Sequence, residues 1–258
     1  MLAAQRHSVI LQEVAKRSAA RISELAEVLS VSEMTVRRDI EVLAEQGLID
    51  KVHGGATAIM EKNMVTEPPF QSKSLREQLA KDAIAARAAD EIRPGDSIAL
   101  MGGSTVFALA RFVAKIPRLT IVTNSLPVSD LLNREGLSDQ TVILAGGLRT
   151  PTDSFVGAIA IDAFKSLNLD IAFMGTHGMD IKGGYSSPNI LEAETNRAVR
   201  EKARKVVILA DHTKWGEVGF STFAELGDAD LLITDEGLSV DALNELRARI
   251  PEVTVAST

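Results

Sequence analysis

Seven short apolar runs, most of them separated by segments of helical character, occupy the chain from about residue 74 onward and constrain its fold more than any other feature. Strands that alternate with helices in this way form parallel sheets covered by helices on both faces. We therefore predict an α/β fold over residues 74–258, with a doubly wound, mostly parallel sheet. The apolar runs are SIALMG, LTIVTNS, TVILAGG, DIAFMGTHG, KVVILAD, ADLLITD and VTVAS, and the helix-like LREQLAKDAIAARAADEI precedes the first.

The composition narrows the classes of function. The chain of 258 residues has room for two domains, and it has no cysteine, which excludes disulfides and thiolate metal sites. Its four histidines stand apart without a metal-binding spacing, so we predict no metal and no cofactor. The N-terminus lacks the apolar stretch of a signal peptide, and no run approaches the about 18 apolar residues of a membrane span. We expect a cytoplasmic protein with no membrane partner.

The charge is unevenly divided along the chain. The net charge of −7 argues against a protein that binds nucleic acid everywhere on its surface. Residues 1–60 carry seven Lys and Arg against eight Asp and Glu, and the remainder carries 21 against 27. Most of the excess negative charge therefore lies after residue 60. The net charge does not exclude specific DNA binding, because one small basic face near the N-terminus is enough for it.

The first 58 residues show three helical patterns followed by a hairpin signal. QRHSVILQEVAKRS, ISELAEVLSV and SEMTVRRDIEVLAEQG each repeat apolar residues at helical spacing. Ser23 is expected to cap the second helix and Ser32 the third, which Gly47 would end. The alternation in LIDKVHGGATAI, around Gly54-Gly55, predicts a β-hairpin. The residues expected to face the core are Val9, Ile10, Val14, Leu25, Ala26, Leu29, Val36, Ile40 and Leu43.

Polar side chains of the third helix project away from that core. Two helices joined by the tight connection LSVS suggest a helix-turn-helix, in which the second helix enters the major groove. Guanidinium groups suit phosphates and guanine edges, although Arg37 and Arg38 could instead be solvated and pair with Glu33 or Glu41. The hairpin would add a wing beside this helix. The residues expected to contact DNA are Ser32, Glu33, Thr35, Arg37, Arg38, Lys51 and His53.

The N-terminal residues carry a strong resemblance. RISELAEVLSVSEMTVRRDIEVLAEQGLIDKVHGGA resembles, without a gap, the N-terminal signature of the DeoR family of bacterial transcriptional regulators. The resemblance implies that residues 1–58 form a winged helix-turn-helix domain, with the helix-turn-helix itself at about 20–39. Residues 59–73 are expected to form a linker, because the stretch MEKNMVTEPPFQSKS, residues 60–74, is polar and its paired prolines are stiff and non-helical.

Polar loops follow several of the predicted strands. Ligands bind parallel α/β sheets where the carboxyl ends of strands meet helix N-termini. The turn from Gly102 to Thr105 joins a strand to a helix and could cradle a phosphate or carboxylate. It lacks the Gly-Lys-Ser/Thr of a P-loop, and the chain has no G-x-G-x-x-G dinucleotide fingerprint. The residues expected to bind an effector are Gly102, Gly103, Ser104, Thr105, Thr123, Asn124, Ser125, Gly147, Asp153, His177, Glu192, Asp211 and Lys214.

Residues from about 75 to 235 resemble the sensor domain of the same family, whose fold is related to ribose-5-phosphate isomerase. In those isomerases a glycine-rich turn holds the phosphate, a glutamate acts as base and a lysine lies near the sugar. Glu192 and Lys214 are the nearest candidates here. The chain departs from the family at Asn196, where a lysine usually stands, so an anion contact from that position is not expected.

Together with the motifs above, the resemblance implies a DNA-binding regulator that represses sugar or carbohydrate metabolism genes and is released from its operator by a phosphorylated sugar. One recognition helix reads only a few base pairs, so we expect a homo-oligomer, a dimer or a tetramer, on double-stranded DNA. The alternative is a sugar-phosphate isomerase with an attached DNA-binding domain. Against it, the loop GTHGMD lacks the dense acidic residues of the isomerases. The absence of cysteine and of a dinucleotide fingerprint weighs against a redox sensor.

Overall fold

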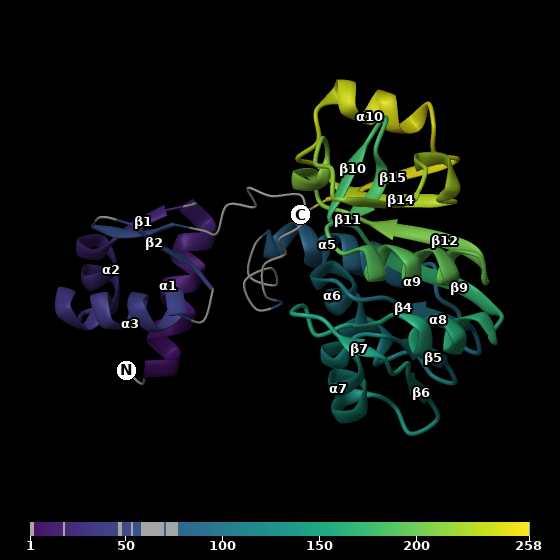
Figure 1. The fold of residues 1–258 in the computed structure, drawn as a ribbon, viewed down its shortest axis with the longest axis horizontal. Helices are drawn as coiled ribbons and strands as arrows, with labels where there is room; N and C mark the ends of the chain where they lie inside the picture. The colour runs from purple at the N-terminus through teal and green to yellow at the C-terminus, as the bar shows by residue number, and fades with distance from the viewer. Residues whose placement is uncertain are drawn as a thin grey trace. The chain divides into compact units, whose positions relative to one another are not determined.

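The computed structural model describes residues 3–17, 19–45, 48–52, 54–57, 70 and 77–257. The chain divides into two compact units, one formed by N-terminal residues and the other chiefly by Leu79–Thr258 (Figure 1). Of the expected linker over residues 59–73, only Phe70 lies within the described residues. None of the described helices is long and apolar enough to cross a membrane.

The N-terminal unit contains three helices and a small antiparallel sheet of order β1-β3-β2. The predicted hairpin is confirmed, because β2 and β3 pair antiparallel around Gly54, whose φ of 83° favours glycine. The inward positions expected on the second and third helices are also confirmed as core or as partly buried residues packed against it. The elements are α1 (Ala3–Arg17), β1 (Ala19–Arg21), α2 (Ile22–Leu29), α3 (Glu33–Glu45), β2 (Asp50–Val52) and β3 (Gly55–Thr57).

The two predicted helix caps have different outcomes. Ser32 caps α3 as expected, since its Oγ accepts the Thr35 backbone N–H at 3.2 Å. The prediction that Ser23 caps α2 is wrong, because the helix begins one residue earlier, at Ile22. The Ile22 N–H instead donates to the carbonyl of Gly54 on the hairpin at 3.0 Å. A tertiary contact therefore satisfies this free N–H group at the start of the helix. Gly47, the expected end of α3, lies outside the described residues.

The second unit is built on a seven-stranded sheet of order β15-β14-β12-β9-β4-β5-β6, in which all neighbouring strands are parallel. All seven predicted strands occur, and the doubly wound prediction is confirmed. The elements of this sheet and its helices are α5 (Gln78–Ala89), β4 (Ser97–Leu100), α6 (Ser104–Val113), β5 (Thr120–Thr123), α7 (Leu126–Glu135), β6 (Thr141–Leu144), α8 (Ala158–Lys165), β9 (Leu169–Gly175), α9 (Ile190–Arg200), β12 (Ala203–Leu209), β14 (Leu231–Asp235), α10 (Val240–Arg247) and β15 (Glu252–Ala256).

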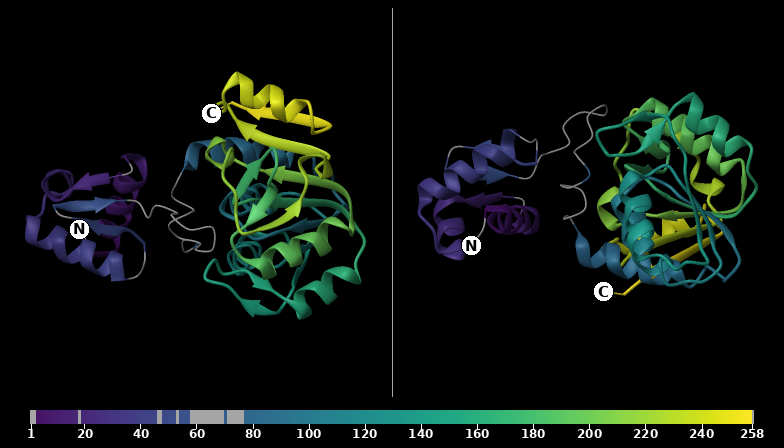
Figure 2. Two further views of the ribbon diagram at one scale, coloured as in Figure 1. Left: turned by 45° about the horizontal axis from the view of Figure 1, so that its top comes forward. Right: turned by 90° about the horizontal axis from the view of Figure 1, so that it is seen from below.

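Helices cover both faces of this sheet (Figures 1 and 2). Along β4, Ile98 and Leu100 pack into one core cluster with α5, α6 and α7. Ala99, between them, packs into a second cluster with α8, α9 and α10. This alternation follows from the period of two in a strand, and it explains why buried parallel strands read as continuous apolar runs.

Two small antiparallel elements were not predicted from the sequence. One is the hairpin of β7 (Leu148–Arg149) and β8 (Phe155–Val156), and the other is the sheet of order β10-β11-β13. These strands are only two to four residues long, and β10, β11 and β13 are also rich in glycine and serine, so none of them forms the apolar runs that mark the main sheet. The remaining elements are β10 (Gly178–Asp180), β11 (Gly184–Ser187), β13 (Ser221–Ala224) and the 3₁₀ turns η1 (His212–Lys214) and η2 (Leu226–Asp228).

Candidate functional sites

The outward face of α3 presents an unusual set of side chains. Arg37 and Arg38 are exposed, whereas Val36 and Ile40 on the inward face are 0% and 1% exposed. Met34 is 64% exposed and lies three and four residues before the arginines, so it shares their face. Sequence reasoning missed Met34, although its helical spacing from the arginines was visible. An exposed apolar side chain beside two cations suits a groove that displays both thymine methyls and guanine edges.

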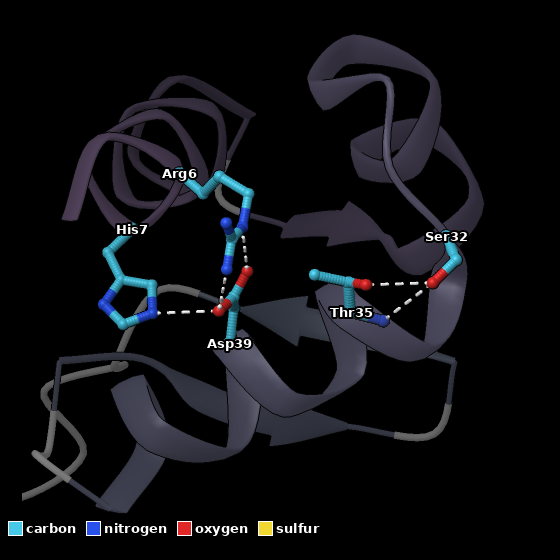
Figure 3. Close-up of polar contacts among 5 residues, drawn as sticks. All are labelled: Arg6, His7, Ser32, Thr35 and Asp39. Atoms are coloured by element: carbon cyan, nitrogen blue, oxygen red, sulfur yellow. Dashed lines mark hydrogen bonds and ion pairs between the residues drawn. The ribbon is translucent and has the colours of Figure 1, made fainter. Parts of the chain in front are cut away.

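Asp39 follows the two arginines in sequence but faces the interior, where it is 6% exposed. Its carboxylate accepts hydrogen bonds from Arg6 Nε at 2.7 Å and Nη2 at 3.1 Å, and lies 3.1 Å from His7 Nε2 (Figure 3). Burial by itself raises the pKa of Asp39, but the hydrogen bonds and charges of Arg6 and His7 outweigh it and leave that pKa lowered. The contact joins α1 to the back of α3.

The start of α3 holds a local hydroxyl cluster. Ser32 Oγ lies 2.9 Å from Thr35 Oγ1 and also accepts the Thr35 backbone N–H (Figure 3). Glu33 occupies the first turn and is exposed, as is Ser32. The helix therefore begins with polar groups beside its free N–H groups, an arrangement that favours anions such as phosphate.

The hairpin is tied to α3 by an exposed ion pair. Lys51 Nζ on β2 lies 2.6 Å from Glu41 Oε1, and the Lys51 hydrogen bond is the main reason that the pKa of Glu41 is lowered. Arg37 and Arg38 add a weaker electrostatic contribution to the lowered pKa of Glu41. Within the described part of the chain, neither arginine forms an ion pair of its own, so the alternative pairing with Glu33 or Glu41 does not occur. His53 lies outside the described residues.

The strand order of the large sheet reverses direction at β4, and such a switch point is where a ligand is expected. From β4 the chain runs outward through β5 to the edge at β6, then returns to β9 on the other side of β4. At this switch point Gly103 after β4 approaches the end of β9, because a Cβ added to Gly103 would lie 3.8 Å from Gly175 Cα. Open α/β sheets bind ligands in the crevice outside such a switch point.

The helix that starts at this point has an open first turn. Gly103 is the N-cap of α6 and makes no side-chain cap hydrogen bond, in contrast to Ser125, Asn189 and Ser239 at the starts of α7, α9 and α10. Ser104 is half-buried at the first helical position, and Thr105 is 7% exposed at the second. The first-turn N–H groups and two hydroxyls are therefore gathered beside the switch point, as an anion requires.

The predicted residues at the end of β5 and directly after it form hydrogen bonds to the protein's own backbone. Thr123 Oγ1 donates to the Leu100 carbonyl at 2.6 Å, and Ser125 Oγ accepts the Val128 N–H at 3.4 Å. Asn124 Oδ1 accepts the Gly102 N–H at 2.9 Å. These three side chains hold the turn in shape, and their contact with an effector stays a prediction.

The β7–β8 hairpin closes over the same turn. Asn124 Nδ2 donates to the Phe155 carbonyl at 3.0 Å, and a Cβ on Gly102 would lie 2.1 Å from Ser154 Oγ, so a larger residue at 102 would displace the Ser154 side chain. Gly147, with a φ of 145°, begins the hairpin. Asp153 sits at its tip, at a φ of 58°, and forms an ion pair with Arg149 at 2.7 Å.

Glu192 in the first turn of α9 lies in a second polar cluster. Its Oε1 accepts from Thr152 Oγ1 at 3.0 Å, and its Oε2 accepts from Ser187 Oγ at 2.9 Å. Thr150 Oγ1 lies 2.8 Å from Thr152 Oγ1 and extends the cluster. Sequence reasoning missed these three hydroxyl residues because they come from unpredicted antiparallel segments and meet only in three dimensions.

The remaining predicted residues lie at the ends of β9 and β12. His177 is 7% exposed, and Asp211 is 1% exposed and caps η1 through the Thr213 N–H. Lys214 ends η1 and is half-buried, and no hydrogen bond or ion pair joins it to the Gly102–Thr105 turn within the described chain. Sequence reasoning missed Asp235, whose carboxylate lies 2.7 Å from His212 Nδ1.

Comparisons with known proteins agree with this architecture. The DeoR-like helix-turn-helix domain matches residues 6–62, and the DeoR C-terminal sensor domain matches residues 76–236. Over 261 residues the chain is 34% identical to the HTH-type transcriptional regulator YulB of Bacillus subtilis (strain 168), covering 99% of each chain. It is 35% identical over 249 residues to the HTH-type transcriptional regulator GlpR of Haloferax volcanii, covering 96% of each.

A further relative is the glycerol-3-phosphate regulon repressor of Escherichia coli (strain K12), 32% identical over 243 residues with 94% of each chain covered. Among solved structures, ribose 5-phosphate isomerase A of Methanocaldococcus jannaschii aligns over 54% of each chain, at 16% identity and a TM-score of 0.40. A likeness this distant carries nothing about activity. Both sequence domains and the full-length relatives agree: the chain is a DNA-binding transcriptional regulator, not an enzyme, and belongs to the DeoR family.

Proposed function

We propose that this regulator represses carbohydrate-metabolism genes and leaves its operator when a phosphorylated sugar binds the α/β unit. In this scheme residues 1–58 bind DNA, residues 74–258 sense the effector, and residues 59–73 link the two. The names of two relatives support the proposal: the glycerol-3-phosphate regulon repressor and a putative aga operon transcriptional repressor of Escherichia coli O157:H7, which is 29% identical.

The open first turn of α6 is the observation that carries the effector assignment. A phosphate there would meet free N–H groups, the positive end of the helix dipole and the hydroxyls of Ser104 and Thr105 together. Glu192, with its paired hydroxyl neighbours, offers acceptors for sugar hydroxyls. Lys214 on η1 would supply a cation from another strand end of the same sheet edge.

The exposed face of α3 supplies the proposed DNA contacts. Arg37 and Arg38 would reach guanine edges or phosphates, and Ser32 and Thr35 would donate to phosphate from the helix start. Lys51 on the wing would reach the backbone beside them. Because one such surface reads only a few base pairs, the scheme requires at least two copies of the chain on each operator.

A gel-shift titration tests the whole scheme. The purified full chain is titrated against a fragment carrying the promoter of its own transcription unit, with a shuffled fragment as control. A panel of sugar phosphates, and the same sugars without phosphate, is then added to the shifted complex. We expect a specific shift that only a phosphorylated sugar reverses. A specific shift that responds to none of the panel overturns the effector assignment, and the lack of any specific shift overturns operator binding.

A further inference from the structure

Strand β6 forms one edge of the seven-stranded sheet and leaves apolar side chains in contact with solvent. Ile143 and Leu144 are 42% and 37% exposed, and Leu137 before the strand and Leu148 after it are 42% and 63% exposed. No other stretch of twelve residues in the described chain exposes more than two large apolar side chains. Ile143 and Leu144 are consecutive in the strand and project from opposite faces of the sheet, so the edge exposes apolar side chains on both faces. Exposed apolar side chains gathered at the edge of a sheet mark an interaction site in folded proteins.

The exposure arises because the helical cover stops before the edge. Ile143 pairs in register with Val122 of β5, and both side chains point to the same face of the sheet. Val122 is 2% exposed and packs into the core cluster beneath α8 and α9, whereas Ile143 is 42% exposed. The layer that covers that face therefore ends between β5 and β6.

The β6 edge lacks the sequence features that normally prevent an edge strand from pairing with a strand of another chain. Solitary edge strands carry charges, prolines or bulges that discourage pairing with another chain. The sequence of β6 is Thr-Val-Ile-Leu, without a charge or a proline, and its pairing with β5 has a regular register. The opposite edge differs, because β15 begins at the exposed, charged Glu252 and its Val253 packs against the core.

We propose that β6 is an interface between two copies of this chain, in which the two β6 strands pair antiparallel across a two-fold axis. A two-fold axis brings residues near it beside their own copies, so any charge there would meet a like charge. The uncharged strand avoids this.

A second copy is the fitting occupant because the proposed DNA-binding function needs two recognition helices related by a two-fold axis, and the inference rests on that function for this choice alone. Pairing at β6 would satisfy the free backbone groups of the edge and cover Leu137, Ile143, Leu144 and Leu148. The interface also adjoins the proposed effector site, because Leu148 lies in the β7–β8 hairpin that closes over Gly102.

The first test places a charge at the proposed axis. Ile143→Lys in the full chain is compared with Val240→Lys, a change of the same kind on α10, where Val240 is 73% exposed. Because like charges placed face to face cost several kcal/mol, we expect self-association of Ile143→Lys to weaken by at least about 100-fold. Sedimentation equilibrium should show a smaller assembly for Ile143→Lys and the wild-type assembly for Val240→Lys.

A second test does not depend on disrupting the assembly. The natural chain has no cysteine, so Ile143→Cys introduces a single thiol. Only the residue on the two-fold axis faces its own copy, and with Ile143 there, as proposed, its two equivalent Cα atoms lie about 4.5–5.5 Å apart, within disulfide range. Under mild oxidation we expect the disulfide-linked dimer to form at least about tenfold faster with Ile143→Cys than with the exposed control Val240→Cys.

The results of these two tests can overturn the β6 interface without overturning operator binding, and the reverse. A monomeric wild-type chain, equal cross-linking of the two cysteine variants, or an unchanged mass for a folded Ile143→Lys overturns the interface. Circular dichroism establishes whether Ile143→Lys is folded, and if it is not, the cross-linking rates decide. If wild-type protein fails to shift its promoter fragment but still cross-links through residue 143, operator binding is wrong and the interface stands.

Discussion

Asp39 and Arg6 lie 33 residues apart in sequence and are joined by two hydrogen bonds, from Nε at 2.7 Å and Nη2 at 3.1 Å. The pair connects α1 to the buried face of α3, directly behind the two arginines proposed to contact DNA. Paired guanidinium and carboxylate groups resist rotation more than a single hydrogen bond does. We infer that this pair sets how α3 presents its outer face.

Asp39→Ala should therefore destabilise the N-terminal unit by about 1–3 kcal/mol, because it removes charge-assisted hydrogen bonds and leaves Arg6 without this carboxylate. Urea denaturation followed by far-ultraviolet circular dichroism would measure the change in the first unfolding transition. Glu27→Ala, at an exposed position on α2, is the control and should be near neutral. Equal stability of the two variants would show that the ion pair contributes nothing.

The same pair makes the stability of this unit depend on pH. The pKa of Asp39 is lowered in the folded state, so between that value and the unfolded value of about 3.9 the unfolded chain binds more protons. The stabilisation is thus fully present above about pH 4 and is lost as the pH falls through the folded pKa. The stability difference between wild type and Asp39→Asn should shrink across that range. A difference that is constant from neutral to acidic pH would contradict this origin.

Arg37→Ala and Arg38→Ala should each weaken operator binding by about 1–3 kcal/mol at fixed salt, since each would remove a groove or phosphate contact. Both residues are exposed, so the melting temperature should change little. Arg247→Ala on α10, also exposed, controls for the loss of a positive charge. Gel-shift titration makes the measurement, and unchanged affinity in the double variant would rule out α3 as the recognition helix.

Thr105→Val should weaken effector binding by roughly tenfold or more, because hydrogen bonds to charged groups contribute about 1.5–3 kcal/mol. Thr105 is 7% exposed and valine has nearly its shape, so the fold and operator binding should persist. The variant should then remain on its operator in the presence of the inducing sugar phosphate. Isothermal titration calorimetry compares it with Thr120→Val, at the amino end of β5. If Thr105→Val retains wild-type affinity, the phosphate binds elsewhere.

Tyr185→Phe should leave the α/β unit as stable as wild type or up to about 1–2 kcal/mol more stable. The Tyr185 side chain is fully buried and stacks on Phe223, and its hydroxyl has no hydrogen-bond partner among the described residues. Burial, with a smaller effect from the charge of Asp228, raises the pKa of Tyr185 far above its usual value. Chemical denaturation measures the change, and a loss of more than about 1 kcal/mol would indicate a partner for the hydroxyl.

The sequence by itself determined the local structure that repeats regularly. The apolar runs identified all seven parallel strands, and helical spacing placed Val36, Ile40 and Leu43 in the core with Arg37 and Arg38 outside. The same spacing also puts Asp39 on the inward face, three residues after Val36. The two arginines beside it favour an exposed carboxylate instead, and its contacts with Arg6 and His7 explain why Asp39 is buried.

Only the tertiary structure decided which distant groups meet. At the start of α2, the carbonyl of Gly54 accepts the Ile22 N–H in place of the expected cap by Ser23. The carboxylate of Glu192 accepts hydrogen bonds from Thr152 and Ser187, which lie on antiparallel segments too short and polar to show a periodic apolar pattern. Such contacts depend on strand order and loop closure, which bring together residues that share no local pattern. The exposure of Ile143 has the same cause: its sequence is that of a buried strand, and only its place at the edge of the sheet leaves it open to solvent.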